Sequence, residues 1–339
     1  MDEVSEVSEV IGMVRGAWVT LCVRAACVLG VVDELDEPRT LSELAGRTGC
    51  DLPTLARLLR VLVDLGLLNR ADDRYGVTTR GEVLGTGHPS RVRDLALMQT
   101  VVPNLTAWSH LADSVRDGAS AYDRVNGQSS WDWLAANAPE QARFNAAMAR
   151  RGELQADAIA SSVDLSGASL LVDVGGGQGA LVAALLTAAP HLRAIVADQP
   201  SVAEAATAVL AESGLGHRAH GQATDFFSAV PSGGDVYLLS NVLHDWDDEQ
   251  AIEILTVIRQ AMAATSRLLI VECVLDAPSR SAWDQRDLHL VDLHMLVMFG
   301  ARERTQAEYD QLLTTAGFTP SSLTASPNTW NVLLAEPTG

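Results

Sequence analysis

The sequence predicts an α/β protein in which a helical, winged-helix-like N-terminal module precedes a doubly wound, mostly parallel sheet. Strand and helix patterns alternate from about residue 168, which is typical of a parallel sheet with helices on both faces. A glycine run follows the first of these strands, and two short helices and a hairpin occupy the earlier part. At 339 residues the chain is long enough for two domains, which we place at 1–100 and 101–339, the second opening with a helical segment at 101–160.

The N-terminal module carries local signals for two short helices and a hairpin. Thr40 and Asp51 are suitable N-cap residues, and Pro53 falls in the first turn of the second helix. Apolar residues repeat with a helical period through 55–63, and Gly66 ends that helix. Residues 67–78 then read as a hairpin around a polar tip at 71–74.

Charge argues against a nucleic-acid partner for this module. The formal net charge is −19, whereas a surface that binds phosphate backbones must be basic. The second helix offers only Arg57 and Arg60 as cations. We therefore interpret the module as a dimerisation or substrate-lid unit, with a DNA-binding regulator as the alternative.

Composition excludes several further classes of protein. The chain contains no lysine, so it can form neither a pyridoxal phosphate Schiff base nor a Walker A loop nor a protein-kinase core. Its cysteines have no zinc or redox spacing and are expected to be idle thiols. They are Cys22, Cys27, Cys50 and Cys273.

We expect a soluble, cytoplasmic protein that does not enter a membrane. No apolar run reaches the roughly 18 residues needed to cross a bilayer, because the best candidate, 16–32, is interrupted by Arg24. The acidic start lacks the basic region of a secretory signal.

A predicted strand at 170–174 leads into a glycine-rich loop at 175–179 and then into a helix at 180–189. Glycines let a ligand approach the backbone, and the helix N-terminus favours a negatively charged group. Gly175, Gly177 and Ala180 also match a relaxed dinucleotide-binding fingerprint. Asp198, after a second strand at 194–197, can hold the ribose of NAD or of S-adenosylmethionine, so the loop leaves both ligands open. Further strands are predicted at 235–239 and 267–271.

Four segments together carry a specific resemblance: LVDVGGGQG at 171–179, TDFF at 224–227, LLSNVLHDWDDE at 238–249 and GARERT at 300–305. With them, the chain resembles the plant-type small-molecule O-methyltransferases and their actinobacterial relatives in antibiotic and other natural-product biosynthesis. The resemblance covers nearly the whole chain. It implies a Rossmann-like class I methyltransferase fold, a homodimer formed through residues 1–100, and an S-adenosylmethionine-binding catalytic domain in 101–339.

The resemblance assigns seven residues to the methyl donor: Asp173, Gly175, Gly177, Asp198, Asp225, Phe226 and Ser240. Asp198 is expected to hold the ribose, Asp225 to accept from the adenine amino group, and Phe226 to pack on the ring. Ser240 stands where plant members often have a lysine, so its contact with the donor is expected to be weaker or made by the main chain.

His244 matches the general base of the family and follows a strand at its carboxyl end, where open α/β sheets bind ligands. A phenol with a pKa of about 10 is mostly protonated at neutral pH, and an imidazole can remove its proton as the new bond forms. Glu272 and Glu303 match the family carboxylates that flank this histidine. A surface ion pair with a neighbouring arginine is the alternative for Glu303. Asp247 is expected to cap the following helix.

The resemblance also places seven residues in the substrate pocket: Trp131, Phe144, Met148, Asp245, Asp292, His294 and Met295. Aromatic and methionine residues at helical spacing are equally typical of a core. His294 is unusual, because this position is commonly apolar or carries an amide. With His244 and Asp245 it could form a two-histidine, one-carboxylate metal site. We expect no metal, because a metal-bound His244 could not act as a base and because neighbouring side chains at a strand end usually point apart.

The predicted activity is therefore S-adenosylmethionine-dependent methylation of a hydroxyl group on a small aromatic molecule. Three alternatives remain at this point. They are a family member with changed chemistry (N- or C-methylation, hydroxylation or decarboxylation), an NAD-dependent oxidoreductase, and a DNA-binding regulator.

Overall fold

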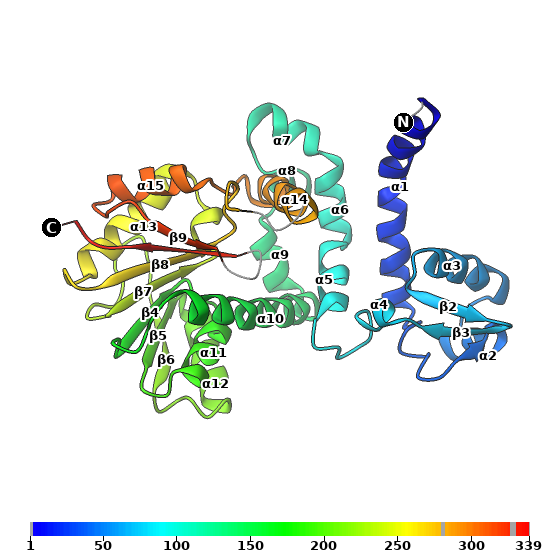
Figure 1. Ribbon diagram of the computed structural model, residues 1–339, viewed down its shortest axis with the longest axis horizontal. Helices are drawn as coiled ribbons and strands as arrows, with labels where there is room; N and C mark the ends of the chain where they lie inside the picture. The colour runs from blue at the N-terminus through cyan, green and yellow to red at the C-terminus, as the bar shows by residue number, and fades with distance from the viewer. Residues whose placement is uncertain (1–2, 279–281, 326–329, 339) are drawn as a thin grey trace. The chain divides into compact units, whose positions relative to one another are not determined.

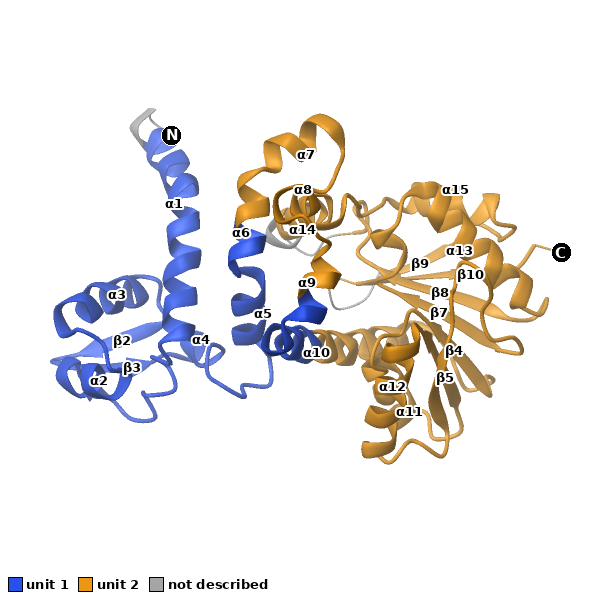
Figure 2. Cartoon of the chain, turned by 180° about the vertical axis from the view of Figure 1, so that it is seen from behind, with its two compact units in different colours: residues 1–105, 134–147 blue, residues 106–133, 148–339 orange. Residues whose placement is uncertain are grey.

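A computed structural model describes residues 3–278, 282–325 and 330–338 of the chain. The chain forms two compact units (Figure 2). Unit 1 comprises residues 1–105 and 134–147, and unit 2 comprises residues 106–133 and 148–339. Three helices contribute residues to both units: α6 (Val102–Ser109), α9 (Ser130–Ala136) and α10 (Ala138–Ser162).

Unit 1 contains the predicted pair of helices and the hairpin, which are confirmed (Figure 1). Its elements are α1 (Glu3–Val28), β1 (Arg39–Thr40), α2 (Leu41–Thr48), α3 (Leu52–Asp64), β2 (Leu68–Ala71), β3 (Arg74–Val77), α4 (Thr79–Glu82) and α5 (Val92–Gln99). The two hairpin strands pair antiparallel, and β1, which the sequence did not predict, adds to them in the order β1-β3-β2.

The predicted helix caps are present. Thr40 forms a capping box with Glu43 at the start of α2, and Asp51 Oδ1 accepts a hydrogen bond of 3.1 Å from the Thr54 amide at the start of α3. These caps satisfy amide groups that have no partner within the helix. The apolar faces of α2 and α3 pack together around Leu44 and Leu59, which are fully buried.

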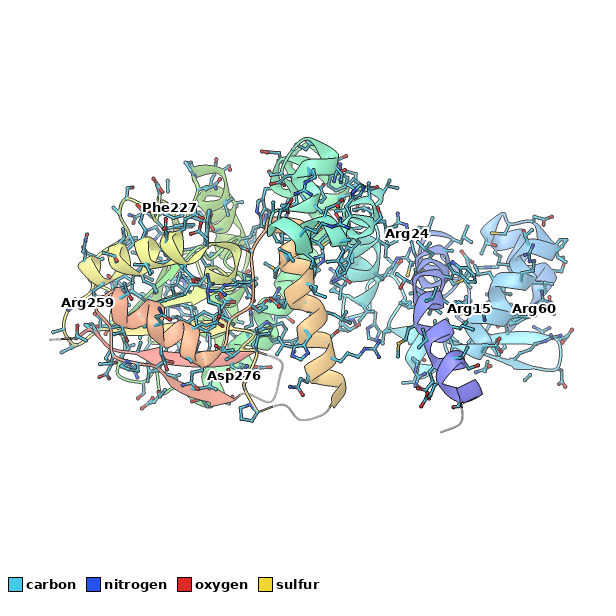
Figure 3. The ribbon with its side chains drawn as sticks, turned by 90° about the horizontal axis from the view of Figure 1, so that it is seen from above. Arg15, Arg24, Arg60, Phe227, Arg259 and Asp276 are labelled. Atoms are coloured by element: carbon cyan, nitrogen blue, oxygen red, sulfur yellow. The ribbon has the colours of Figure 1, made fainter. Side chains whose placement is uncertain are left out.

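Helix α1 is apolar but largely exposed. Within it, Ser5–Val28 is long and apolar enough, by length and composition, to cross a membrane, with a mean hydropathy of 1.4. The expectation that no such segment exists is therefore wrong, because Arg24 does not offset so many apolar neighbours. Arg24 itself donates to the Leu97 carbonyl and to Thr100 Oγ1, both at 2.9 Å, within unit 1 (Figure 3). The exposed apolar side chains of α1 include Val7, Val10, Ile11, Met13, Val14 and Trp18. An apolar face of this size marks an interaction surface.

Unit 2 contains a seven-stranded sheet in the order β6-β5-β4-β7-β8-β10-β9. The strands are β4 (Leu170–Val174), β5 (Arg193–Asp198), β6 (Ala219–Ala223), β7 (Val236–Ser240), β8 (Arg267–Glu272), β9 (Ser322–Ala325) and β10 (Asn331–Ala335). The first five strands in this order, β6, β5, β4, β7 and β8, are parallel to one another, whereas β10 runs antiparallel to both β8 and β9. The four predicted strands and the mostly parallel sheet are confirmed, and β6, β9 and β10 were not predicted.

Helices cover both faces of the sheet, as the doubly wound prediction requires (Figure 1). Helices α10, α11 (Ala180–Ala188) and α12 (Pro200–Glu212) lie on one face, and α13 (Asp248–Ala261) and α15 (Gln306–Thr315) lie on the other. Helices α7 (Leu111–Asp117), α8 (Ala121–Asn126) and α14 (Ala282–Phe299) pack on one another in a separate cluster, and a 3-10 turn, η1 (Leu243–Asp245), follows β7. Successive residues of β4 alternate between two cores: Leu171 packs with α10, α11 and α12, and Val172 packs with α13 and α15.

Polar contacts hold the last segments of unit 2 in place. Arg259 on α13 donates to the carbonyls of Gly317, at 3.1 Å, and Thr338, at 2.7 Å (Figure 3). Asp276 Oδ1 accepts from the Gln306 amide at 2.8 Å, at the first residue of α15. These contacts anchor the chain on either side of the antiparallel strands.

Candidate active site

Several of the residues predicted to bind the methyl donor or to act in catalysis lie at one edge of the unit 2 sheet. Strands β4, β5, β7 and β8 are parallel, so their carboxyl ends meet at that edge. The glycine loop follows β4, Asp198 ends β5, His244 follows β7 and Glu272 ends β8. The carboxyl edge of an open parallel sheet is where such folds bind their ligands.

The glycine loop adopts a backbone that other residues rarely adopt. Gly175 has φ +72° and Gly177 has φ +58°, both in the left-handed region. A Cβ atom on Gly175 would lie 2.8 Å from Val242 Cγ2, and one on Gly176 would lie 2.3 Å from Asp173 Oδ2. The first two glycines therefore have no room for a side chain.

Asp173 is a buried carboxylate without a hydrogen-bond partner in the described part of the chain. Burial, and then the charge of Asp198, raise the pKa of Asp173 to about 7. Asp198 Oδ2 accepts from the Gly177 amide at 2.9 Å, and burial raises its pKa against that hydrogen bond. Two carboxylates beside a glycine loop, one of them unpaired, suit a ligand with an amino group and ribose hydroxyls.

Aromatic residues border the glycine loop. Phe226 Cε1 lies 3.8 Å from the Cβ position of Gly175, so this ring is within reach of a ligand on the loop. Trp246 makes edge contacts with Phe226 and Phe227, at centroid distances of 6.0 and 4.9 Å. The structure thus brings the predicted ring-packing residue to the predicted loop.

Asp225 and Ser240 occupy the remaining positions predicted for the methyl donor. Asp225 is exposed, and its Oδ1 accepts from the Phe227 amide at 3.1 Å. Ser240, the last residue of β7, accepts a hydrogen bond of 3.2 Å from Asn241 Nδ2. Ser240 is therefore occupied by its neighbour and offers no cation where a lysine would.

His244 lies in η1, is 4 % exposed and faces three carboxylates. Its Nδ1 is 2.9 Å from Glu303 Oε1 and 3.4 Å from Glu272 Oε2, whereas its Nε2 is 3.6 Å from Asp245 Oδ1. The expectation that the side chains of His244 and Asp245 point apart is wrong, because a 3-10 turn, rather than an extended strand, places them. Nδ1 faces two carboxylates, so it carries the proton of the neutral ring and leaves Nε2 as the basic nitrogen.

Glu272 and Glu303 are buried beside His244 and are held by different hydrogen bonds. Glu272 Oε1 accepts from the amides of Val242, at 3.0 Å, and Leu243, at 3.1 Å, and so holds the entry into η1. The amide of Glu303 donates to Asp292 Oδ1 at 2.9 Å. Main-chain amides therefore hold the carboxylate of Glu272, whereas the side chain of Asp292 holds the backbone of Glu303.

The surface ion pair considered for Glu303 is absent from the described structure. Glu303 is 2 % exposed. Its neighbours Arg302 and Arg304 pair with Asp248, at 2.7 and 2.9 Å. Asp247 caps α13 as predicted, its Oδ1 accepting from the Gln250 amide at 2.8 Å.

Electrostatics make His244 strongly basic. Burial lowers its pKa, but the negative charges of Glu272, Asp245 and Glu303 outweigh burial and raise the pKa to about 9. Burial raises the pKa of Glu272 to about 7 against the attraction of the imidazole. The three carboxylates therefore favour the protonated, imidazolium form of His244.

His294 does not join His244. The indole N–H of Trp108 donates to His294 Nδ1 at 3.2 Å, and the two rings stack with centroids 6.0 Å apart. Burial lowers the pKa of His294 to about 4, so the ring is neutral and its proton is on Nε2. Among the described residues, the side-chain atoms that could coordinate a metal ion and lie together belong to His244, Glu272 and Glu303. These atoms all lie within 4.8 Å of one another.

The other predicted pocket residues lie on three helices. Trp131 on α9 is 47 % exposed and stacks on Phe299, with centroids 5.4 Å apart. Phe144 and Met148 are one turn apart on α10 and share a helix face. On α14, Met295 is buried one turn after Asp292.

Sequence reasoning missed Arg151. Its guanidinium donates to Asn241 Oδ1 and lies over the ring of Trp330, 5.3 Å from the centroid. Asn241, between β7 and η1, has φ +54°, a strained backbone for a residue other than glycine. An arginine within a long helix normally indicates a solvated face, so no local signal marked this one.

Comparison with known proteins gives the family. Residues 108–319 match the O-methyltransferase domain, and residues 11–87 match the O-methyltransferase dimerisation domain. The phenazine O-methyltransferase PhzM of Lysobacter antibioticus is 37% identical over 330 residues, covering 96% of this chain and 94% of that protein. Aclacinomycin 10-hydroxylase RdmB of Streptomyces purpurascens is 34% identical, over 91% of this chain and 83% of its own length.

Solved structures of related proteins have the same fold over nearly the whole chain. The mitomycin 7-O-methyltransferase MmcR superposes with a TM-score of 0.90 at 34% identity, covering 99% of this chain and 98% of the other. The O-methyltransferase NcsB1 from neocarzinostatin biosynthesis, in complex with S-adenosylmethionine and 2-hydroxy-5-methyl naphthoic acid, gives 0.79 at 34%, covering 94% and 95%. The chain therefore belongs to the S-adenosylmethionine-dependent O-methyltransferase family.

Proposed function

We propose that this protein transfers the methyl group of S-adenosylmethionine to a hydroxyl group of a small aromatic molecule in natural-product biosynthesis. The observation that carries the proposal is His244, whose Nδ1 is held by Glu303 and Glu272 at the same sheet edge as the glycine loop. Family membership decides for S-adenosylmethionine over NAD, which the glycine loop alone left open. Three of the relatives described above, PhzM, MmcR and NcsB1, are named as O-methyltransferases, of phenazine, of mitomycin and of neocarzinostatin biosynthesis, which supports a small aromatic acceptor.

The methyl donor supplies an electrophilic methyl group on a positively charged sulfur. We assign its amino group to the unpaired carboxylate of Asp173 and its ribose to Asp198. Gly175 and Gly177 leave room for it at the backbone. Asp225 and Phe226 receive the adenine, and Ser240 makes a weak or main-chain contact.

His244 acts as the general base through Nε2. The acceptor oxygen would bond to the methyl carbon as the carbon–sulfur bond breaks and S-adenosylhomocysteine leaves. The O–H bond of the acceptor breaks and its proton passes to Nε2, while Nδ1–H stays hydrogen-bonded to Glu303. Glu303 and Glu272 stabilise the imidazolium that results. The surrounding carboxylates favour the imidazolium form, whereas the positive charge of a bound methyl donor lowers the pKa of His244 and so favours the neutral, basic ring.

The acceptor is proposed to bind among the aromatic, sulfur-containing and polar side chains predicted from the sequence. They are Trp131, Phe144, Met148, Asp245, Asp292, His294 and Met295. Trp108 holds His294 so that its Nε2–H is a fixed donor toward an acceptor oxygen. Such fixed polar groups in an apolar pocket select orientation.

We further propose a soluble, cytoplasmic homodimer that binds neither nucleic acid nor membrane. The exposed apolar face of α1 overlaps the dimerisation domain at 11–87, so a second copy is its natural cover. A partner helix would also explain why a helix apolar enough to cross a bilayer occurs here. The net charge of −19 disfavours nucleic acid.

A second candidate is changed chemistry on the same donor site. The similarity to a relative named as a hydroxylase, RdmB, favours keeping this candidate. In that case the methyl donor would bind but would not be consumed.

One experiment separates the two candidates. The protein is incubated with pooled aromatic natural-product precursors and a methyl donor labelled in its methyl group, and the products are examined by mass spectrometry. O-methylation predicts products that gain one labelled methyl group on oxygen, together with equal amounts of S-adenosylhomocysteine. Oxygenated or decarboxylated products with the methyl donor intact would instead support the second candidate.

A further inference from the structure

Arg151 forms no salt bridge within the described part of the chain. Its only recorded contacts in the described part of the chain are the hydrogen bond to Asn241 Oδ1 and the ring of Trp330, and neither partner is charged. The neighbouring Arg150 pairs with Glu153 at 2.6 Å on the solvent side of the same helix. The guanidinium interacts electrostatically with Asp245 and Glu272 but makes no hydrogen bond to either, so it retains N–H groups for a ligand.

Several hydrogen-bond donors at and beside Arg151 are unsatisfied. Arg151 Nε, Gln155 Nε2 and Trp330 Nε1 are buried nitrogen atoms with no hydrogen-bond partner among the described residues, and we call these three residues the N–H cluster. Gln155 is 3 % exposed and follows Arg151 by one turn of α10. Unpaired buried donors are costly, so the cluster favours a ligand that brings acceptor oxygens and negative charge.

The N–H cluster borders the reaction centre. Asn241, which accepts from Arg151, lies three residues before His244, and Trp330 precedes β10, whose Asn331 pairs with Glu272. Burial raises the pKa of Asp245, and the charges of His244 and Arg151 oppose that rise. The guanidinium therefore acts electrostatically on the residue beside the base.

We propose that Arg151 binds a carboxylate group of the acceptor, so that the substrate class is hydroxylated aromatic carboxylic acids. The inference rests on the proposed methylation of an aromatic hydroxyl. A guanidinium presents a planar pair of N–H donors that matches a carboxylate, and it offsets the repulsion from Asp245. The carboxylate of the methyl donor is the other source of this chemistry. The acceptor is favoured because Arg151 contacts the strand ends beside His244 and has no contact with Asp173, Gly177 or Asp198.

Titration calorimetry on the full-length protein saturated with S-adenosylhomocysteine tests this proposal. The probes are an ortho-hydroxynaphthoic acid and its carboxamide, which have similar shapes and differ in charge. The wild type should bind the acid about 10-fold or more tightly than the amide, as expected for a charge-assisted pair. Arg151→Gln should remove the preference, Arg151→Lys should keep part of it, and the control Arg150→Gln should keep all of it.

Three results would overturn the assignment. They are equal binding of acid and amide by the wild type, no binding of either compound, and an acid preference that survives Arg151→Gln. A fourth would reassign the residue: if Arg151→Gln lowers the affinity for S-adenosylhomocysteine and leaves acid selectivity unchanged, Arg151 holds the carboxylate of the methyl donor. Thermal unfolding of each variant checks that the fold is retained.

Turnover separates this inference from the proposed function. Acids and amides methylated on oxygen with equal efficiency would leave the methyltransferase proposal standing and refute the role of Arg151. An Arg151-dependent acid preference without any oxygen methylation would do the reverse.

Discussion

Glu303 Oε1 lies 2.9 Å from His244 Nδ1, and both side chains are buried. This contact decides which nitrogen can act. A proton on Nδ1 is shared with the carboxylate, so only Nε2 can accept a proton from a bound hydroxyl. Glu303 in turn is positioned by Asp292, so three residues from separate parts of the chain define one basic atom.

Replacing His244 should lower turnover without changing binding of the methyl donor. We expect His244→Ala to bind S-adenosylhomocysteine nearly as the wild type does, because His244 acts on the acceptor. Turnover should fall by about 10²–10⁴-fold, the usual contribution of a general base. Calorimetry and single-turnover kinetics measure the two quantities, and wild-type turnover in this variant would refute the assignment.

Glu303→Gln should change the pH dependence of the reaction. Burial lowers the pKa of His244, and the negative charges of Glu272, Asp245 and Glu303 together raise it to about 9. Removing the charge of Glu303 should therefore lower that pKa. The acidic limb of the kcat/KM profile should move to lower pH, and kcat should fall because the imidazolium loses support. Glu249→Gln, an exposed change on α13, is the matched control and should leave the profile in place. An unchanged profile in Glu303→Gln would contradict the arrangement.

Asp173→Asn should stabilise the fold at high pH and weaken binding of the methyl donor. Because burial and Asp198 raise the pKa of Asp173 to about 7, its contribution to stability is present at low pH and is lost as the pH rises from about 4 through 7. The amide cannot ionise, so the variant should unfold at a higher temperature than the wild type at pH 8 while binding the methyl donor more weakly. Melting curves from pH 4 to 8 test this, and a wild-type pH dependence in the variant would rule it out.

Removing the Asp198 carboxylate, which is assigned to the ribose, should weaken binding of the methyl donor. We expect Asp198→Ala to reduce the affinity for S-adenosylhomocysteine by about 1.5–3 kcal/mol, the range for hydrogen bonds to a charged group. Part of that loss would come from the Gly177 amide, which donates to Asp198 in the structure. Calorimetry measures it directly, and an unchanged affinity would mean that the ribose binds elsewhere.

Activity should survive exhaustive treatment with EDTA. His244, Glu272 and Glu303 are close enough to surround an ion, but a metal on this histidine would remove the base and break its contact with Glu303. We therefore expect no stoichiometric iron or zinc by elemental analysis. A protein that carries about one metal per chain, with activity lost on chelation and restored by that metal, would overturn the mechanism.

The sequence by itself determined the features that depend on local rules. Thr40 and Asp51 cap their helices because capping needs only a side-chain oxygen three residues before an amide. The glycine loop could be placed because strand, glycines and helix are contiguous, and the parallel sheet followed from alternation along the chain. The motif resemblance then assigned His244, Glu272 and Glu303 to one site.

Tertiary structure alone decided which side chains meet. Glu303 is 59 residues from His244 in the chain, Trp108 is 186 from His294, and Arg151 is 90 from Asn241. No local pattern reports such pairings, because they arise only when the helices and strand ends pack. The protonation of His244 follows the same rule: an isolated imidazole has a pKa of about 6.5, and three carboxylates packed around it in a buried site raise that value to about 9.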